Sequence, residues 1–230
     1  MLLSHVPLGQ LVLERGIVFV DLAVAQVAGL GLVVAAALGW ETGGPAAQAI
    51  AVGAALGAAA LLVASEARWP ALQEAVIGSL FAAAASAEVL ILSQSAHAAE
   101  HLKDLLVGQI LWVSQAQLAV LGGLGVAVVW ARAALDLERR RFAFYAVLAL
   151  TVTASVQVAG VLLVFATLVL PAMAGRFAGR GLALGWPAAA GALGFAIGLG
   201  ASAALDLPTG AAIVCGLALV ATLSAIRSRT

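Results

Sequence analysis

Apolar residues fill most of this chain in stretches long enough to cross a lipid bilayer, and short polar breaks separate the stretches. A membrane-spanning helix needs about 20 predominantly apolar residues, with a range of about 17–25. The breaks delimit apolar segments at roughly 16–39, 46–64, 71–92, 116–135, 142–159, 161–175, 182–204 and 209–226. This pattern predicts an all-α fold, a polytopic membrane helix bundle of about seven to eight transmembrane segments.

One apolar stretch, 142–175, is too long for a single span. It contains no charged residue, and Arg141 and Arg176 close its two ends. A single helix over it would reach about 50 Å at 1.5 Å per residue, whereas the hydrocarbon core is about 30 Å thick. Because clustered arginine marks the cytoplasmic side, both ends belong on that side. We therefore predict a broken, re-entrant helical hairpin at 142–175, which turns near Gln157 and Gly160.

The cations of the chain predict its orientation in the membrane. When the end that carries Arg227 is assigned to the cytoplasm and the spans are counted backwards, every arginine lies on the cytoplasmic side and only Lys103 lies outside. Such an excess follows the positive-inside rule. We therefore expect a multi-pass protein with a cytoplasmic C-terminus.

Composition narrows the functional class. Hydrophobic residues make up 64% of the chain and charged residues only 10%, against about 25% charged residues in soluble domains. We therefore treat 1–230 as one integral-membrane domain, and its formal net charge of zero gives no basic surface for nucleic acid. The sequence has no G-x-x-x-x-G-K-[ST] loop for ATP. We expect no enzymatic activity from this chain, and an active transporter built on it would need a separate ATPase.

Several polar residues lie within the apolar segments, among them Asp21, Gln26 and Glu88. Asp21 lies early in the first segment, Gln26 follows it by five residues, and Glu88 lies near the outer end of the third segment. Ionisable residues at membrane depth are costly, and they usually face the bundle interior or a water-filled cavity. Two interpretations stay open for these residues: they line a hydrophilic path for a cation, or they form hydrogen bonds between helices.

The loop predicted on the outer side carries His97, Glu100 and His101. On a helix, positions i, i+3 and i+4 share one face, and two imidazoles with a carboxylate suit Zn²⁺ or Mn²⁺. The same letters match the H-x-x-E-H pattern of one class of metalloprotease. Three interpretations stay open: an outer metal-transfer site, a proteolytic centre, and a solvated loop helix with ordinary histidines.

Four colinear segments carry a resemblance to a known family: LERGIVFVDLAVAQVAGLG at 13–31, HAAEHLKDLLVGQILWVS at 97–114, VQVAGVLLVFATLVLPAMAGR at 156–176 and LDLPTGAAIVC at 205–215. Together they resemble the permease subunit of the metal-ion ABC transporters that import zinc, manganese or iron. The resemblance implies a homodimeric permease in a bacterial inner membrane. It also implies cytoplasmic ATP-binding cassette ATPase subunits and an external metal-binding protein. No intrinsic cofactor is implied, and the metal ion, Zn²⁺ or Mn²⁺, is the transported substrate.

The chain departs from this family's usual pattern at three places. Asp21 matches the first residue of the family's D-A-L-S-H text, but Ala25 stands where the family has His. The cytoplasmic segment 136–141 is shorter than the family's usual ATPase-docking segment. Residues 1–10 resemble only the tail of the family's first hydrophobic helix, so we expect the chain to lack that helix.

These observations give one preferred function and two alternatives. The preferred function is an ATP-driven importer permease, with Asp21, Gln26 and Glu88 lining the metal path and with His97, Glu100 and His101 as an outer transfer site. The alternatives are an intramembrane metalloprotease that uses the histidine loop and a membrane scaffold that transports nothing.

Overall fold

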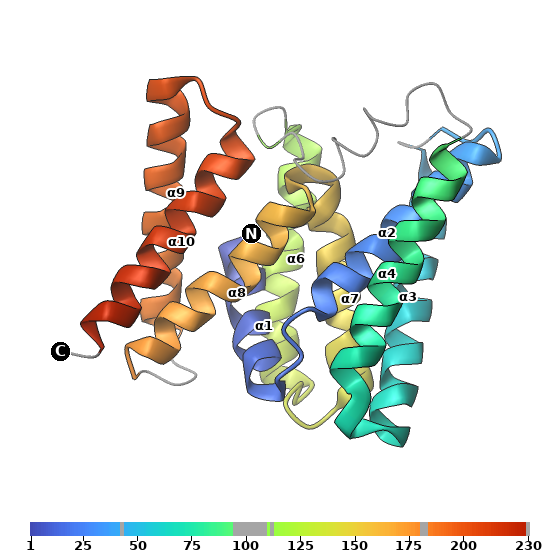
Figure 1. Cartoon of the computed structure of the whole chain (residues 1–230), viewed down its shortest axis with the longest axis horizontal. Helices are drawn as coiled ribbons and strands as arrows, with labels where there is room; N and C mark the ends of the chain where they lie inside the picture. Colours follow the sequence, from blue (N-terminus) through green and yellow to red (C-terminus); the bar gives the residue numbers. More distant parts are fainter. Residues whose placement is uncertain (42–43, 94–109, 111–112, 180–183, 229–230) are drawn as a thin grey trace. The chain divides into compact units, whose positions relative to one another are not determined.

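The computed structural model describes residues 1–230 except 42–43, 94–109, 111–112, 180–183 and 229–230 (Figure 1). Within the described residues, all regular secondary structure is helical, which confirms the predicted all-α fold. The helices are α1 (Leu2–Arg15), α2 (Val20–Ala37), α3 (Pro45–Arg68), the short 3₁₀ helix η1 (Pro70–Leu72), α4 (Gln73–Leu92), α6 (Gln115–Ala134), α7 (Arg141–Ala159), α8 (Val161–Phe177), α9 (Gly185–Leu205) and α10 (Thr209–Arg227).

Seven described helices or helix pairs are long and apolar enough to cross a membrane: α2, α3, η1 with α4, α6, α7, α9 and α10. Helix α8 is apolar but shorter, with 17 residues. The predicted membrane bundle of about seven to eight segments is therefore confirmed. Helix α1 was not predicted as an element of its own, because the first apolar segment was placed at 16–39.

The chain divides into two compact units, each built from separated parts of the sequence. Unit 1 comprises Met1–Gly16, Leu106–Ala134 and Ser155–Thr230, and unit 2 comprises Ile17–Leu105 and Leu135–Ala154. Neither unit is one consecutive piece of the chain, and the single domain over 1–230 stays a prediction.

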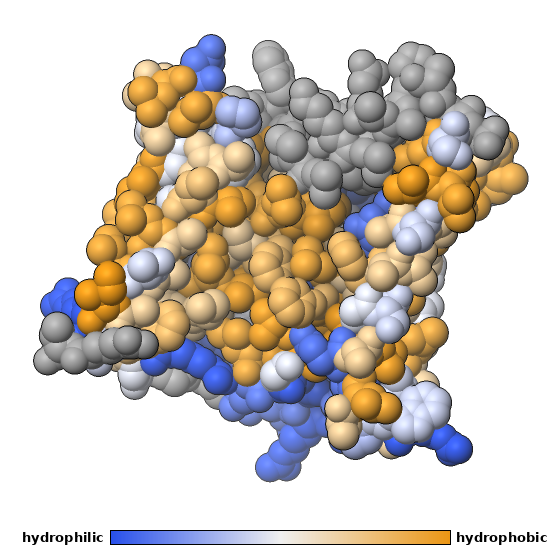
Figure 2. Space-filling model, viewed as in Figure 1, coloured by the Kyte–Doolittle hydropathy of each residue, from blue (hydrophilic) through white to orange (hydrophobic). Residues whose placement is uncertain are grey.

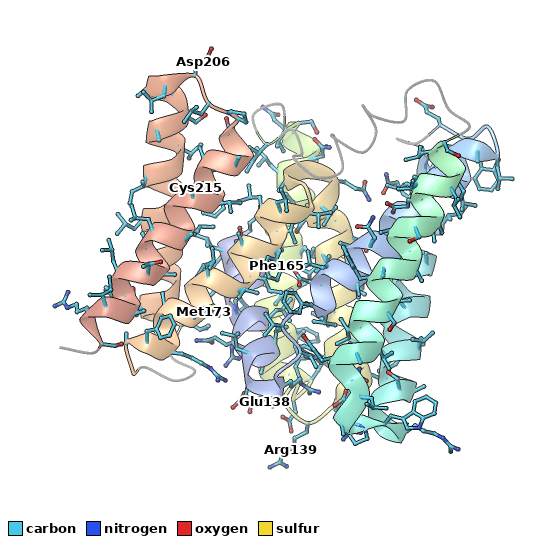
Figure 3. The ribbon with its side chains drawn as sticks, in the orientation of Figure 1. Glu138, Arg139, Phe165, Met173, Asp206 and Cys215 are labelled. Carbon is cyan, nitrogen blue, oxygen red and sulfur yellow. The ribbon has the colours of Figure 1, made fainter. Side chains whose placement is uncertain are left out.

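In unit 1, close backbone contacts join α9 to α10. A methyl group added at Gly198 would lie 2.3 Å from the Cα of Ile213, and one added at Gly216 would lie 2.4 Å from the carbonyl oxygen of Gly194. Both distances are shorter than any ordinary van der Waals contact, so only glycine allows the two helices to approach this closely. Exposed apolar side chains, among them Leu193 and Leu219, cover the outer surface of the pair (Figure 2), and Cys215 on α10 is also exposed (Figure 3).

In unit 2, α2 packs against both α3 and α4. Gly31 on α2 faces α3, where an added methyl would lie 3.1 Å from the Cα of Ala51. Small residues at such positions let helix backbones approach within a membrane, where no hydrophobic force drives helices together. Unit 2 thus holds the three helices that carry Asp21, Gln26 and Glu88 or pack directly on them.

The predicted break in 142–175 is confirmed at Gly160. This buried residue has φ 76° and ψ 159°, a region of backbone space that is essentially restricted to glycine. Its N–H still bonds the carbonyl of Val156 at 2.8 Å, and its carbonyl accepts the N–H of Val164 at 3.1 Å. One residue therefore ends α7 and starts α8. Helix α8 then continues through Pro171 to Phe177.

The arginines gather at one end within each unit. In unit 1, α1, α6, α8 and α10 run in the same direction (Figure 1), and their last turns carry Arg15, Arg132, Arg176 and Arg227. In unit 2, α3 ends at Arg68, and Arg141 at the start of α7 pairs with Glu66 near that end. This distribution agrees with the charge asymmetry of the sequence. Which end faces the cytoplasm stays a prediction.

Candidate functional site

Asp21 is a buried carboxylate near the N-terminus of α2. Asp21 is 1% exposed, and the nearby residues Val20, Ala23 and Val24 are completely buried. The positive end of the helix dipole favours a negative charge at this position. Its Oδ1 atom has no hydrogen-bond partner among the described residues. One oxygen of a buried acid is therefore available to a ligand.

Gln26 and Glu88 form a direct contact between α2 and α4. The amide Nε2 of Gln26 donates a hydrogen bond to Oε2 of Glu88. Glu88 is 1% exposed, and its other oxygen, Oε1, has no partner among the described residues. A donor aimed at one oxygen fixes the orientation of the carboxylate. Oε1 of Glu88 is thus a second buried acceptor in unit 2.

The contact between Gln26 and Glu88 also sets the depth of Asp21. Helices α2 and α4 run in the same direction (Figure 1). At 1.5 Å per residue, Gln26 lies about 9 Å from the start of α2, and Glu88 lies about 22 Å from the start of α4. Because Gln26 and Glu88 are in contact, the start of α2 lies beside a point of α4 roughly 13 Å from the start of α4. Asp21 is the second residue of α2. The sequence pattern placed Asp21 near one end of a long span, whereas the structure places it near the middle of the length of α4.

Among the described residues of unit 2, no cation pairs with these acids. The described arginines of unit 2 are Arg68, at the end of α3, and Arg139, Arg140 and Arg141, at or before the start of α7. Arg141 pairs with Glu66 at 3.3 Å and Arg139 with Asp136 at 3.7 Å. Buried carboxylates without an opposite charge are costly. Asp21 and Glu88 are thus two buried acids without a counter-charge among the described residues of unit 2.

The structure brings together only part of the predicted site. Gln26 and Glu88 are in contact, and Asp21 lies in the same unit, but the described residues contain no group of three His, Cys, Asp or Glu side chains placed to hold a metal ion. His97, Glu100 and His101 lie outside the described residues, so the outer transfer site stays a prediction. The described part of unit 2 therefore contains no closed metal centre.

Sequence reasoning missed one buried polar residue in unit 1. His5, on α1, is fully buried, with Nδ1 placed 2.9 Å from Oγ of Ser4 and 3.1 Å from the carbonyl oxygen of Met1. Its Nε2 has no hydrogen-bond partner among the described residues. The available signal was a histidine within an otherwise apolar segment, but residues 1–10 had been interpreted as a helix tail.

Helices long and apolar enough to cross a membrane define a polytopic membrane protein. A profile of the ABC 3 transport family matches residues 2–135 and 130–228, so the chain belongs to this family. The resemblance stated from the sequence is thereby confirmed.

Solved structures support the fold. One similar structure is PsaBC from Streptococcus pneumoniae in complex with Fab, at 16% sequence identity and a TM-score of 0.73. The match covers 97% of this chain and 87% of that one. At this identity the likeness establishes the fold alone. No curated protein matches the sequence.

Proposed function

We propose that this chain is the permease subunit of an ATP-driven importer of divalent metal ions in a bacterial inner membrane. The observation that carries the proposal is the pair of buried carboxylates, Asp21 and Glu88, with no counter-charge among the described residues of unit 2. Two carboxylates supply a charge of −2, which a divalent cation neutralises. Membership of the ABC 3 transport family supports the same function.

In the proposed mechanism, carboxylate oxygens replace the water shell of the metal as it crosses the membrane. Oδ1 of Asp21 and Oε1 of Glu88 are the available oxygens, and Gln26 holds the carboxylate of Glu88 in place through its other oxygen. Carboxylate and amide oxygens suit Mn²⁺, and Zn²⁺ and Fe²⁺ also accept carboxylate ligands. Zinc or manganese is the expected substrate, with iron as a further possibility. His97, Glu100 and His101 are the proposed outer transfer site.

Energy and delivery come from partners in this proposal. The chain forms a homodimer, cytoplasmic ATP-binding cassette subunits hydrolyse ATP, and an external metal-binding protein supplies the ion. The C-terminus lies in the cytoplasm. Family membership favours this function over the metalloprotease and the scaffold, and no described residue supports either alternative by a specific contact.

Metal uptake tests the proposal. The permease is co-expressed with the ATPase and the metal-binding protein encoded beside it, in a strain that lacks other importers, and uptake of radiolabelled Zn²⁺ and Mn²⁺ is measured. We expect Asp21→Asn and Glu88→Gln each to reduce uptake at least tenfold. Glu74→Gln, on an exposed position of the same helix as Glu88, is the matched control and keeps wild-type uptake. Unchanged uptake in both pathway variants would overturn the assigned path.

A further inference from the structure

A buried polar network joins the turn between α3 and α4 to the first turns of α7. Nε2 of Gln73 donates to the hydroxyl oxygen of Tyr145 at 3.1 Å and to the carbonyl oxygen of Leu62 at 3.0 Å. The hydroxyl of Ser65 donates to Oε1 of Gln73 at 2.8 Å. Ser65, Gln73 and Tyr145 are 6%, 4% and 0% exposed. Three segments of unit 2 therefore share one set of directional bonds in a dry environment, where each bond is costly to break.

An ion pair forms a second link between the same segments. Nε of Arg141, the first residue of α7, lies 3.3 Å from Oε1 of Glu66, two residues before the end of α3 at Arg68. The side chain of Arg141 is 51% exposed and that of Glu66 is 18% exposed. An exposed pair of this kind contributes little to stability.

The loop before α7 is a tight turn. Asp136 has φ 48°, and its carbonyl oxygen accepts the N–H groups of Arg139 at 3.0 Å and Arg140 at 3.1 Å. Leu137 is buried, whereas Arg139 is exposed and projects outward together with Glu138 (Figure 3). A turn closed by its own hydrogen bonds moves as a unit. The backbone of Arg139 and Arg140 is therefore held by one carbonyl directly before Arg141, where α7 begins.

Helix α4 connects this end of unit 2 to the candidate metal path. Gln73 is the first residue of α4, and Glu88 follows fifteen residues later on the same helix, about 22 Å away. A helix transmits displacement along its axis because every turn is hydrogen-bonded to the next. Helix α4 therefore contacts α7 through Gln73 and also carries the buried acid Glu88.

We propose that Ser65, Gln73 and Tyr145, together with the ion pair between Glu66 and Arg141, are positioning residues that couple the 136–141 turn to α4. When the ATPase moves the turn, the network moves the start of α4 and with it the carboxylate of Glu88. A hydrogen-bonded network between packed elements has discrete arrangements, which suits such transmission. This inference rests on the proposed transport function.

The test measures metal uptake and ATP hydrolysis in the same proteoliposomes, which contain the permease, its ATPase and the metal-binding protein. Tyr145→Phe keeps the ring and removes the hydroxyl that accepts the hydrogen bond from Gln73. We expect the Mn²⁺ or Zn²⁺ transported per ATP hydrolysed to fall roughly two- to tenfold, the change in an equilibrium constant that one net hydrogen bond gives. ATP hydrolysis itself stays near the wild-type rate. Thr167→Val removes a buried hydroxyl whose bond stays within α8, and this control keeps the wild-type ratio.

Charge reversal of the ion pair gives a second readout, at positions that are more exposed than the buried network. Glu66→Arg and Arg141→Glu each lower the transport ratio, and the double variant restores it. A wild-type ratio in Tyr145→Phe and in both single reversals would overturn the coupling network while the transport function stands. A wild-type assembly that hydrolyses ATP and moves no metal would overturn both proposals.

Discussion

The glycine contacts between α9 and α10 allow a quantitative test on one helix. In Gly198→Ala, the new methyl would lie 2.3 Å from Cα of Ile213, 2.6 Å from its backbone nitrogen and 2.7 Å from the carbonyl oxygen of Ala212. Ordinary van der Waals contact begins at about 3.4 Å, so the backbones must separate by roughly 1 Å. All three neighbours are backbone atoms, so no side chain can rotate away. We expect a destabilisation of about 1–3 kcal/mol, the usual range for overpacking.

The matched control is two residues away. A methyl group added at Gly200 meets nothing within 4 Å, so Gly200→Ala lacks the clash and gains helix propensity. Thermal unfolding of the detergent-solubilised protein, followed by tryptophan fluorescence, measures both variants. Since about 1 kcal/mol moves Tm by roughly 2–4 °C in chains of 150–250 residues, Gly198→Ala should unfold several degrees below wild type and Gly200→Ala at or slightly above it. Equal Tm values for the two variants would contradict the close packing of α9 on α10.

Three further variants follow from the described contacts. Gly160→Ala forces a side chain into φ 76° and ψ 159°, which should cost about 1–3 kcal/mol and lower Tm, and an unchanged Tm would argue against the break. Gln26→Leu leaves the buried carboxylate of Glu88 without its donor, so we expect about 1–3 kcal/mol of destabilisation and reduced Mn²⁺ uptake in the assay above. Arg132→Gln loses the charged donor to the Pro7 carbonyl at 3.3 Å and to Gln10 at 3.2 Å, which should lower stability by about 1.5–3 kcal/mol. Wild-type unfolding of this variant would mean that the two contacts contribute nothing.

The span boundaries could be predicted because membrane thickness and backbone hydrogen bonding leave few choices for an apolar segment. The segment predicted at 142–159 is α7 at Arg141–Ala159. The break at Gly160 could be predicted because the stretch 142–175 is too long for one span and has an arginine next to each end. The start of α2 was less predictable. Residues 16–19 are as apolar as the helix itself, so hydropathy alone extended the span to residue 16.

The arrangement within the site could not be predicted. Membrane helices are apolar on all sides, so their sequences do not show which face packs against which neighbour. Nothing in the spacing of Gln26 and Glu88 indicates that these two side chains meet, because their contact depends on the relative shift of α2 and α4. The network of Ser65, Gln73 and Tyr145 could not be predicted for the same reason. Its members come from three helices, and no pattern within any one segment indicates that they are in contact.

The exposed thiol on α10 offers a direct way to follow movement of the protein. Cys215 is the only cysteine in the sequence, and it is adjacent to Gly216, one of the positions where α10 lies close against α9. A spin label or fluorophore attached there needs no cysteine-free background and reports on two tightly packed helices together. In the proposed homodimer, one label on each subunit defines a single distance, whose change during ATP turnover would trace the transport cycle in the unmodified sequence.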